Sequence, residues 1–285
     1  MKKHTIAAIT GASGIIGKTI AKSFAQDGYQ LLLIGKSAES LCALKAELMT
    51  STAARVECFA ADVSNEGQVR EAMEFAKMTF GSLDALITAA GVYGEIGTIE
   101  QCTPSRWLDA ILVNLFGTML CVTYALPLLK KSSRGKIIAF AGGGEGPLPR
   151  FSSYAASKGG VLRFVESVAK ELEPFRIDIN AISPGLVNSG LQQELIAAGP
   201  VKAGREKYDA AVNETKGKAE TVSPERAAAL ALFLASEKSD GITGKNISAV
   251  WDAWNDLPLH KDELSSTDIY NWRRIKPRDR GSGWK

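Results

Sequence analysis

The sequence predicts an α/β fold with a doubly wound, parallel sheet of seven strands and helices on both faces. Short apolar runs alternate with longer segments whose apolar residues recur at helical spacing. The short runs are apolar throughout, as expected for parallel strands that are buried on both faces. The predicted strands are residues 6–10, 31–35, 55–60, 83–90, 136–141, 176–183 and 245–250.

The helical segments lie between these strands and carry the apolar stripe of helices that pack on a sheet. They are residues 15–27, 38–50, 65–80, 104–130, 152–173 and 223–236. No Pro/Gly/Ser-rich linker divides residues 1–250, so we expect one Rossmann-type domain. Residues 188–222 interrupt the alternation as a polar, mostly helical insertion, which is typical of a lid or binding loop.

Residues 251–285 lie outside the alternation as a basic extension that contains tryptophans. Because so aromatic a segment seldom stays free in solvent, we expect part of it to pack on the body or on a partner. From Trp272 onward six basic residues face only Asp279, and such a tail can contact phosphates or remain a solvated terminus.

The composition excludes several classes of function. Of the 285 residues, 45% are hydrophobic and 23% are charged, and no unbroken apolar run approaches the roughly twenty residues of a membrane span. The net charge of +3 is too small to predict nucleic-acid binding. The N-terminal apolar run flows into a glycine loop, which favours a first strand over a signal peptide.

The cysteines give no support for a metal or redox site, and we expect reduced thiols in a cytoplasmic protein. They lie far apart, with no CxxC pair, at Cys42, Cys58, Cys102 and Cys121.

The first predicted strand runs into TGASGIIG and then into a helix. In this place glycines let the backbone approach a pyrophosphate, and the free N–H groups of the helix start favour its charge. The sequence therefore predicts a dinucleotide cradle. Its residues are Thr10, Gly11, Ser13, Gly14, Ile16 and Gly17.

The end of the second strand indicates which dinucleotide is bound. An acidic side chain there holds the ribose hydroxyls of NAD, but the sequence has Gly35, Lys36 and Ser37. A lysine and a hydroxyl suit the extra phosphate of NADP, so we expect NADP, with NAD as the alternative if Lys36 is only a solvated lysine.

Two further strand ends are expected at the cofactor. Asp62 and Val63 follow the third strand. Ala89, Ala90 and Gly91 close the fourth, where small residues let the backbone lie against adenine and ribose.

Tyr154 and Lys158 are four residues apart on a predicted helix and share one face. A neighbouring ammonium favours the phenolate, so we expect it to lower the pKa of Tyr154 toward a useful acid/base range. Alone, this spacing also occurs by chance on helix surfaces.

Together these motifs resemble the short-chain dehydrogenase/reductase family, in its single-domain branch, over residues 5 to about 250. The resemblance implies that Tyr154 is the catalytic acid/base and that Lys158 also binds the nicotinamide ribose. It implies that Asn114, in LVNLFG, holds a relay water, and that Asp62 contacts the adenine.

In the segment SPGLVNS, the resemblance implies that Pro184, Gly185, Val187 and Ser189 lie beside the nicotinamide. It also implies a homodimer or homotetramer assembled through the two long helices, 104–130 and 152–173.

Three positions depart from the family pattern. The glycine motif is TGxxGxxG, the spacing typical of the extended, sugar-nucleotide-modifying branch. Thr88 replaces an asparagine that commonly braces the sheet, and Ala141 replaces the serine that ordinarily hydrogen-bonds the substrate oxygen.

Losing that serine removes one donor to a developing oxyanion, which costs on the order of 3 kcal/mol. The backbone N–H groups of Gly142, Gly143 or Gly144 are candidate replacements at the substrate, because glycines leave no side chain in the way. Ser152 and Ser153 are candidates by residue type, but just ahead of a helix we expect N-caps.

The sequence therefore predicts an NADP-dependent oxidoreductase that interconverts a hydroxyl and a carbonyl on a small or medium-sized polar molecule, with no metal. A sugar nucleotide or another phosphorylated substrate is a variant that the glycine spacing and the basic tail suggest. Two alternatives remain: a cofactor-binding protein without activity, and an epimerase or dehydratase with tightly bound cofactor.

Overall fold

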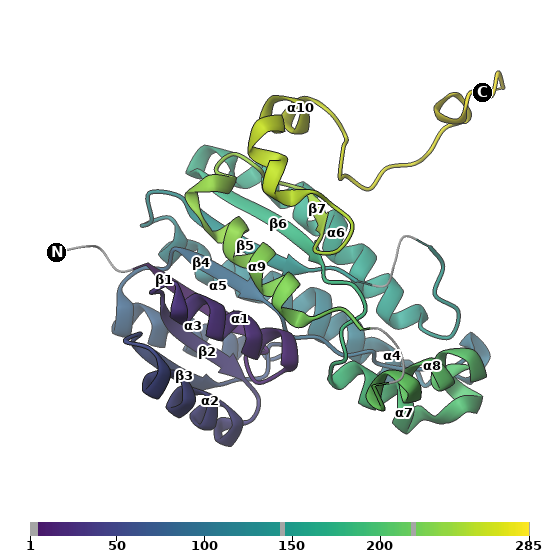
Figure 1. Ribbon diagram of the computed structural model, residues 1–285, viewed down its shortest axis with the longest axis horizontal. Coiled ribbons are helices and arrows are strands. Elements are labelled where there is room, and N and C mark those ends of the chain that lie inside the picture. Colours follow the sequence, from purple (N-terminus) through teal and green to yellow (C-terminus); the bar gives the residue numbers. More distant parts are fainter. Residues whose placement is uncertain (1–4, 143–145, 218–220, 285) are drawn as a thin grey trace.

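The computed structural model describes residues 5–142, 146–217 and 221–284. It contains a seven-stranded sheet in the order β3-β2-β1-β4-β5-β6-β7, in which every neighbouring pair is parallel. Each predicted strand occurs, so the predicted fold class is confirmed (Figure 1). The strands are β1 (Ile6–Thr10), β2 (Gln30–Gly35), β3 (Val56–Ala60), β4 (Ala85–Thr88), β5 (Gly135–Phe140), β6 (Ile177–Ser183) and β7 (Asn246–Ser248).

The helices fill the predicted intervals and cover both faces of the sheet. They are α1 (Ile15–Gln26), α2 (Ala38–Ser51), α3 (Glu66–Phe80), α4 (Pro104–Ala110), α5 (Gly117–Leu129), α6 (Ser152–Leu172), α7 (Gly190–Ala203), α8 (Arg205–Thr215), α9 (Pro224–Ala235) and α10 (Lys261–Ser266). Short segments of tighter 3-10 helix add Ile99–Gln101, Glu173–Phe175, Glu237–Ser239, Trp254–His260 and Pro277–Arg280.

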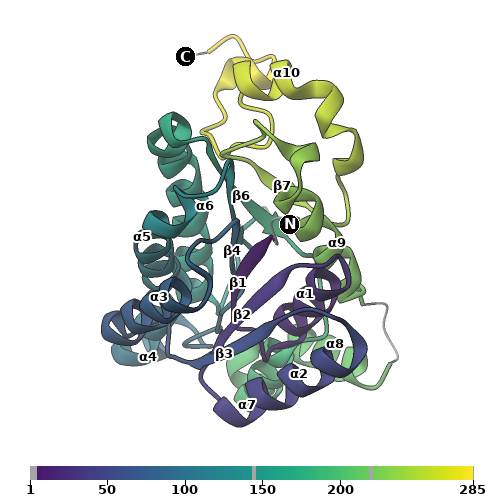
Figure 2. The same cartoon turned by 90° about the vertical axis from the view of Figure 1, so that its left-hand side faces the viewer.

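Two hydrophobic cores sandwich the sheet. Figure 2 shows α3, α5 and α6 on one face and α1, α2 and α9 on the other. Successive side chains of a strand point to opposite faces. In β1, Ala7 and Ile9 therefore join the core under α1 and α9, whereas Ile6 and Ala8 join the core under α5 and α6.

The strand order reverses between β1 and β4, since the chain first builds outward to β3 and then continues on the other side of β1. Ligands of open parallel sheets bind in the crevice beyond the carboxyl ends of the strands at such a reversal. The fold thus places the ends of β1 and β4 at the expected binding crevice.

The predicted helix 104–130 is not one regular helix. A π-helical segment, Ile111–Phe116, separates α4 from α5. The wider π turn carries Asn114 into the interior, where only 1% of its surface is exposed. Sequence periodicity alone did not show this change in helix type. By length and composition Pro104–Leu129 is apolar enough to cross a membrane, but here α5 packs on α3 and on β4 and β5.

The insertion forms α7 and α8, in agreement with its predicted helical character. Gly199 interrupts α7 with a φ of 78°, so the helix is kinked at this residue. Leu195, Ala203 and Ala211 bury their side chains in a third, smaller apolar cluster together with Phe151 and Tyr154. We call this segment, residues 188–215, the lid.

The C-terminal extension packs in part, as predicted. The ring of Trp254 packs at a tilt against Phe233 with ring centres 5.4 Å apart, whereas Trp251 and Trp284 are each 72% exposed. Arg273 forms ion pairs with Asp268 and Asp279 inside the extension.

Figures 1 and 2 both place the end of the extension far from α7 and α8. The basic tail thus lies apart from α7 and α8 in both views, and its contacts with phosphate stay a prediction.

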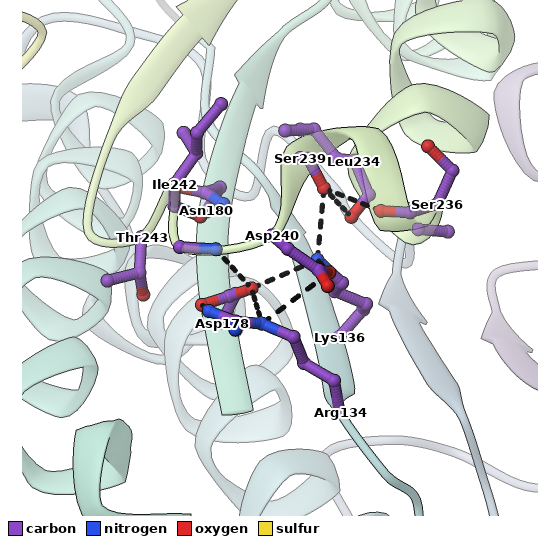
Figure 3. Close-up of polar contacts among 12 residues, drawn as sticks. Arg134, Lys136, Asp178, Asn180, Leu234, Ser236, Ser239, Asp240, Ile242 and Thr243 are labelled. Carbon is purple, nitrogen blue, oxygen red and sulfur yellow. Dashed lines mark hydrogen bonds and ion pairs between the residues drawn. The ribbon is translucent and has the colours of Figure 1, made fainter. Parts of the chain in front are cut away.

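A buried ion cluster lies at the amino ends of β5 and β6 (Figure 3). Lys136 and Asp178 are register partners, and Lys136 Nζ lies 2.9 Å from Asp178 Oδ2 and 2.8 Å from Asp240 Oδ1. Arg134 makes two hydrogen bonds to Asp178, of 2.7 and 2.9 Å, and Ser239 Oγ accepts a third bond from Lys136. Each charge in this cluster therefore has an opposite partner.

Candidate active site

The glycine loop after β1 is shaped by close backbone packing. A Cβ on Gly17 would lie 2.2 Å from the carbonyl oxygen of Gly11, and a Cβ on Gly11 would lie 2.7 Å from Ala90 Cα. Glycine is therefore required at both positions, because the helix start and the loop after β4 press against the loop. Ala90 N also donates a 3.4 Å hydrogen bond to Thr10 Oγ1.

The first turn of α1 is open to an anion. Its N-cap, Gly14, offers no side chain as a cap, and the first turn holds no acidic residue. Ser13 and Gly14 are exposed, and Ile16 is half-buried. These free N–H groups, beside a glycine loop with no room for side chains, fit the pyrophosphate of a dinucleotide.

The end of β2 converges on the same loop. A Cβ on Gly35 would lie 3.4 Å from Ser13 Oγ, so the two segments are in contact. Lys36 is largely exposed, and its Nζ lies 3.5 Å from Asp62 Oδ2. Ser37 caps α2 by accepting a hydrogen bond from Ser40 N.

The ends of β3 and β4 lie on either side. Asp62 Oδ1 accepts hydrogen bonds from the N–H and hydroxyl of Ser64. Burial by itself raises the pKa of Asp62, but these bonds and Lys36 outweigh it and hold the pKa below its usual value. Val63 is buried against Gly117 at the start of α5, so its side chain is part of the core.

Asn114 braces the loop after β4. Its Nδ2 donates 2.9 Å hydrogen bonds to Val92 O and Ser157 Oγ, and its Oδ1 accepts one of 2.9 Å from Val92 N. A Cβ on Gly91 would lie 3.3 Å from Asn114 Oδ1 and 3.8 Å from Lys158 Nζ. The structure therefore brings Gly91, Asn114 and Lys158 together, although they are far apart in sequence.

Tyr154 and Lys158 lie on the buried face of α6, as their spacing predicted. Lys158 Nζ donates a 2.7 Å hydrogen bond to Phe140 O and lies 5.8 Å from the centre of the Tyr154 ring. Within the described residues no carboxylate forms an ion pair with Lys158, and burial lowers its pKa to about 8. It is 6% exposed.

The pKa of Tyr154 departs from the sequence expectation. Burial raises it well above the usual value, and the neighbouring Tyr93 and the carboxylate of Glu194 raise it further. The predicted lowering by Lys158 is therefore wrong for the protein alone, because removal of the phenol from water outweighs an ammonium that points at Phe140 O.

The region of the missing serine is closely packed. Ala141 is 3% exposed, and its N–H donates a 2.9 Å hydrogen bond to Ile182 O. A Cβ on Gly142 would lie 2.6 Å from Tyr154 Oη. Gly142 thus presents bare backbone to the phenol, while Gly143 and Gly144 lie outside the described residues.

Neither candidate replacement hydroxyl caps α6, so the predicted N-caps are wrong. The N-cap position is Phe151, and no side chain caps it. Ser153 Oγ donates to Tyr93 O and Glu95 O, and Ser152 Oγ accepts a hydrogen bond from Trp107 Nε1. Both hydroxyls fix the walls of the site instead.

The segment after β6 passes under the start of the lid. Gly185 has a φ of 79°, and a Cβ there would lie 2.7 Å from a methyl of Val250. Pro184 is half-buried, Val187 is buried, and Ser189 is the N-cap residue of α7 without a capping bond. This segment connects the end of β6 to the lid.

Sequence reasoning missed the lid side of the site. The ring of Tyr93 packs edge-on against Tyr154 and tilted against Phe151, with ring centres 4.9 and 5.1 Å apart. Tyr93 N donates a 2.9 Å hydrogen bond to Glu194 Oε2, which ties α7 to the loop after β4. Only the position of Glu194 inside the predicted insertion could have suggested it.

Among the described residues no group of three His, Cys, Asp or Glu side chains is arranged to hold a metal ion. The groups around the crevice are instead glycine backbone, a free helix N-terminus and the Tyr154–Lys158 pair. They fit a nicotinamide dinucleotide.

Comparison with known proteins agrees with this geometry. The model of the short chain dehydrogenase family matches residues 5–199. D-beta-hydroxybutyrate dehydrogenase of Cupriavidus necator is 32% identical over 251 residues, which cover 86% of this chain and 95% of that protein. Levodione reductase of Leifsonia aquatica is 32% identical over 238 residues, 81% of this chain and 87% of that protein.

A crystal structure of levodione reductase superposes with a TM-score of 0.77 at 26% identity and covers 90% of this chain and 98% of that one. The chain therefore belongs to the short chain dehydrogenase family and is an oxidoreductase that uses a nicotinamide dinucleotide to interconvert hydroxyl and carbonyl groups of small molecules.

Proposed function

We propose that this protein is an NADP-dependent oxidoreductase that acts on a small or medium-sized polar alcohol or its carbonyl counterpart, with Tyr154 as the acid/base. The observation that carries the proposal is the convergence of Tyr154, Lys158 and Asn114 beside Gly91 at the carboxyl edge of the sheet. When bound, the nicotinamide supplies the hydride donor or acceptor.

Each residue has a distinct part in the proton transfer. Tyr154 Oη gives its proton to the carbonyl oxygen during reduction and takes it back during oxidation. Lys158 holds the ribose and adds positive charge beside the phenol. Asn114 anchors the loop after β4 and serves the relay of protons to solvent.

The substrate oxygen needs a donor in place of the missing serine. Gly142 supports a backbone solution, because it alone of the described residues in its loop lies against Tyr154 Oη without a side chain. A substrate hydroxyl that serves this purpose is the second solution.

The preference for NADP rests on the end of β2. Ser13, Lys36 and Ser37 present two hydroxyls and an ammonium around Gly35, and no acidic residue directly follows β2. The nearby carboxylate of Asp62 lies 3.5 Å from Lys36 Nζ and helps to hold the ammonium in place. Among similar structures, xylitol dehydrogenase is described with NAD⁺ and YwfH as NADPH-dependent. The cofactor preference is therefore inferred from the residues of this chain.

The remaining binding residues form the walls of the same crevice. We assign the pyrophosphate to residues 10–17, the adenine side to Asp62 and Val63, and the nicotinamide side to residues 184–189. Ala89, Ala90 and Gly91 line the ribose side.

We further propose a cytoplasmic homodimer or homotetramer. A groove of about 560 Å³ between α5 and α6 exposes apolar side chains, among them Met119, Phe164 and Val168, on the face through which the family frequently assembles. All four cysteines are free thiols, which suits a reducing compartment. Light scattering of the purified protein measures the mass, and a monomer contradicts the assembly.

The test of the enzyme uses absorbance of the reduced cofactor over a panel of alcohols and carbonyls. Activity is expected with NADP(H), and Tyr154→Phe is expected to lower kcat/KM about thousandfold while NADP binding persists. Tight NADP binding without turnover on the whole panel would favour the alternative of an inactive cofactor-binding protein.

A further inference from the structure

Glu194 stands out among the charged groups near Tyr154, because it has no cationic partner within the described residues. It extends from α7 and is half-buried. One carboxylate oxygen, Oε2, accepts the 2.9 Å hydrogen bond from Tyr93 N, and the described residues supply no donor to Oε1. The carboxylate is therefore held in place with one oxygen free.

The cations around the lid are engaged elsewhere. Lys202 Nζ lies 3.3 Å from Glu95 Oε1, and Arg106 Nε lies 3.5 Å from Glu95 Oε2. Lys207 Nζ stands 4.5 Å from the centre of the Phe151 ring. In the lid, Lys202 therefore pairs with Glu95, Lys207 lies over the Phe151 ring and Arg205 pairs with Asp209. Among the described residues none of these cations, nor Arg106, forms an ion pair with Glu194.

The negative charge of Glu194 reaches the reacting phenol. It contributes to the raised pKa values of both Tyr93 and Tyr154. Burial raises the pKa of Glu194 itself, and the Tyr93 N–H and the charge of Arg106 offset this only in part. A partly buried carboxylate without an ion-pair partner is stabilised when a cation binds beside it.

The surroundings add a second feature that suits a cation. Tyr93 and Tyr154 place two aromatic rings edge to face, 4.9 Å between centres, next to the backbone that holds Glu194. An ammonium group is attracted both to a free face of a tyrosine ring and to a carboxylate, so this combination suits a cationic ligand.

We propose that Glu194 is a specificity-determining residue that selects substrates with an ammonium group close to the reacting carbinol, that is, amino alcohols and amino ketones. The free Oε1 accepts the N–H of the ammonium, while the alcohol oxygen lies at Tyr154 Oη. The same carboxylate repels a substrate carboxylate, so hydroxy acids are disfavoured. The inference rests on the proposed function and names its substrate class.

The test compares three alcohols that share one carbon skeleton and differ only in the group beside the carbinol: aminophenylethanol, phenylethanediol and mandelate. For each compound we would measure kcat/KM with NADP, and the dissociation constant by calorimetry with NADP present. The smaller set aminopropanol, propanediol and lactate repeats the comparison without the aromatic group.

For the wild-type protein we expect kcat/KM of the amine to exceed that of the diol by about tenfold, since the amine gains a hydrogen bond between charged groups. The acid is expected to fall below the diol. In Glu194→Gln the amine-to-diol ratio is expected to fall to about one. The amide keeps the acceptor for Tyr93 N, and the ratio cancels any general loss of activity.

The matched control is Glu206→Gln, which removes one carboxylate from an exposed position of the same lid. Its amine-to-diol ratio is expected to equal that of the wild type. An equal fall in both variants would show a long-range charge effect and overturn the assignment.

The proposal is overturned if the acid is preferred, if the three compounds of both sets bind equally, or if neither amine binds. It stands if the amines bind selectively through Glu194 but are not oxidised, and in that case the proposed function fails instead.

Discussion

Two lysines touch opposite ends of the same strand and differ in how their charge is compensated. Lys136, at the start of β5, is 3% exposed and has Asp178 and Asp240 within 2.9 Å. Lys158, beside the last residue of β5, is 6% exposed and has the carbonyl oxygen of Phe140 as its hydrogen-bond acceptor.

The difference separates a structural charge from a functional one. The Lys136 ammonium meets both of its carboxylates only in the folded protein, because they come from β6 and from the loop before β7. The pairs therefore connect β5 to β6 and to that loop. A buried ammonium with a carbonyl alone is under-compensated, and its pKa falls to about 8. Perturbed groups of this kind collect at sites where a ligand supplies the missing interactions.

Removal of the Lys158 ammonium is expected to reduce activity more than any other substitution considered in this comparison. Lys158→Met is expected to lower kcat/KM about thousandfold, because the proton-transfer pair loses its cation. The control is Lys170→Met, the same substitution at an exposed position of α6, which is expected to keep the wild-type rate. Comparable losses in both variants would show that the effect comes from the helix and not from the site.

At neutral pH and without cofactor, the free energy of unfolding of Lys158→Met is expected to exceed that of the wild type by up to about 3 kcal/mol. Burial lowers the pKa of Lys158 from 10.5 to about 8. Between these pH values Lys158 is protonated in the unfolded chain but neutral in the folded protein. The wild type therefore becomes more stable relative to Lys158→Met as the pH rises from about 8 to 10, and the difference between their free energies of unfolding narrows. Urea unfolding at several pH values measures this gap, and a gap that widens over this range contradicts the prediction.

The next prediction concerns the ion cluster around Lys136. Asp178→Asn is expected to lower the free energy of unfolding by about 3 kcal/mol at neutral pH, because Lys136 and Arg134 lose their shared carboxylate. Burial alone raises the pKa of Asp178, but Arg134 and Lys136 outweigh it and hold the pKa below its usual value.

The stability due to the Asp178 carboxylate is therefore present above a pH of about 4 and is lost as the pH falls through the lowered pKa. The difference in free energy of unfolding between the wild type and Asp178→Asn should narrow as the pH falls. The kcat/KM of Asp178→Asn should equal that of the wild type. The control is Asp209→Asn, which breaks an exposed pair with Arg205 and should change stability by less than about 1 kcal/mol.

The smallest change in kcat/KM is expected for a substitution in the loop after β5, beside Lys158. Ala141→Ser is expected to change kcat/KM by less than about tenfold, because Gly142 backbone already faces the phenol. A gain of roughly a hundredfold would show that the missing serine had left the site merely impaired.

The sheet could be predicted from the sequence, because strands buried on both faces need continuous apolar runs, and the helices could be predicted from their apolar stripes. It also determined the glycine loop and the pairing of Tyr154 with Lys158, since both depend on neighbours a few residues apart.

Properties that depend on segments distant in the chain could be read only from the folded protein. The inward turn of Asn114 needs the π-helical segment and the loop after β4. The raised pKa of Tyr154 comes from burial under α7, and the use of Ser152 and Ser153 on the walls comes from Trp107 and the loop at Tyr93. The free carboxylate oxygen of Glu194 depends on which cations other residues occupy. Spacing along the chain fixes contacts one turn apart, whereas burial and charge compensation depend on everything that packs around a group.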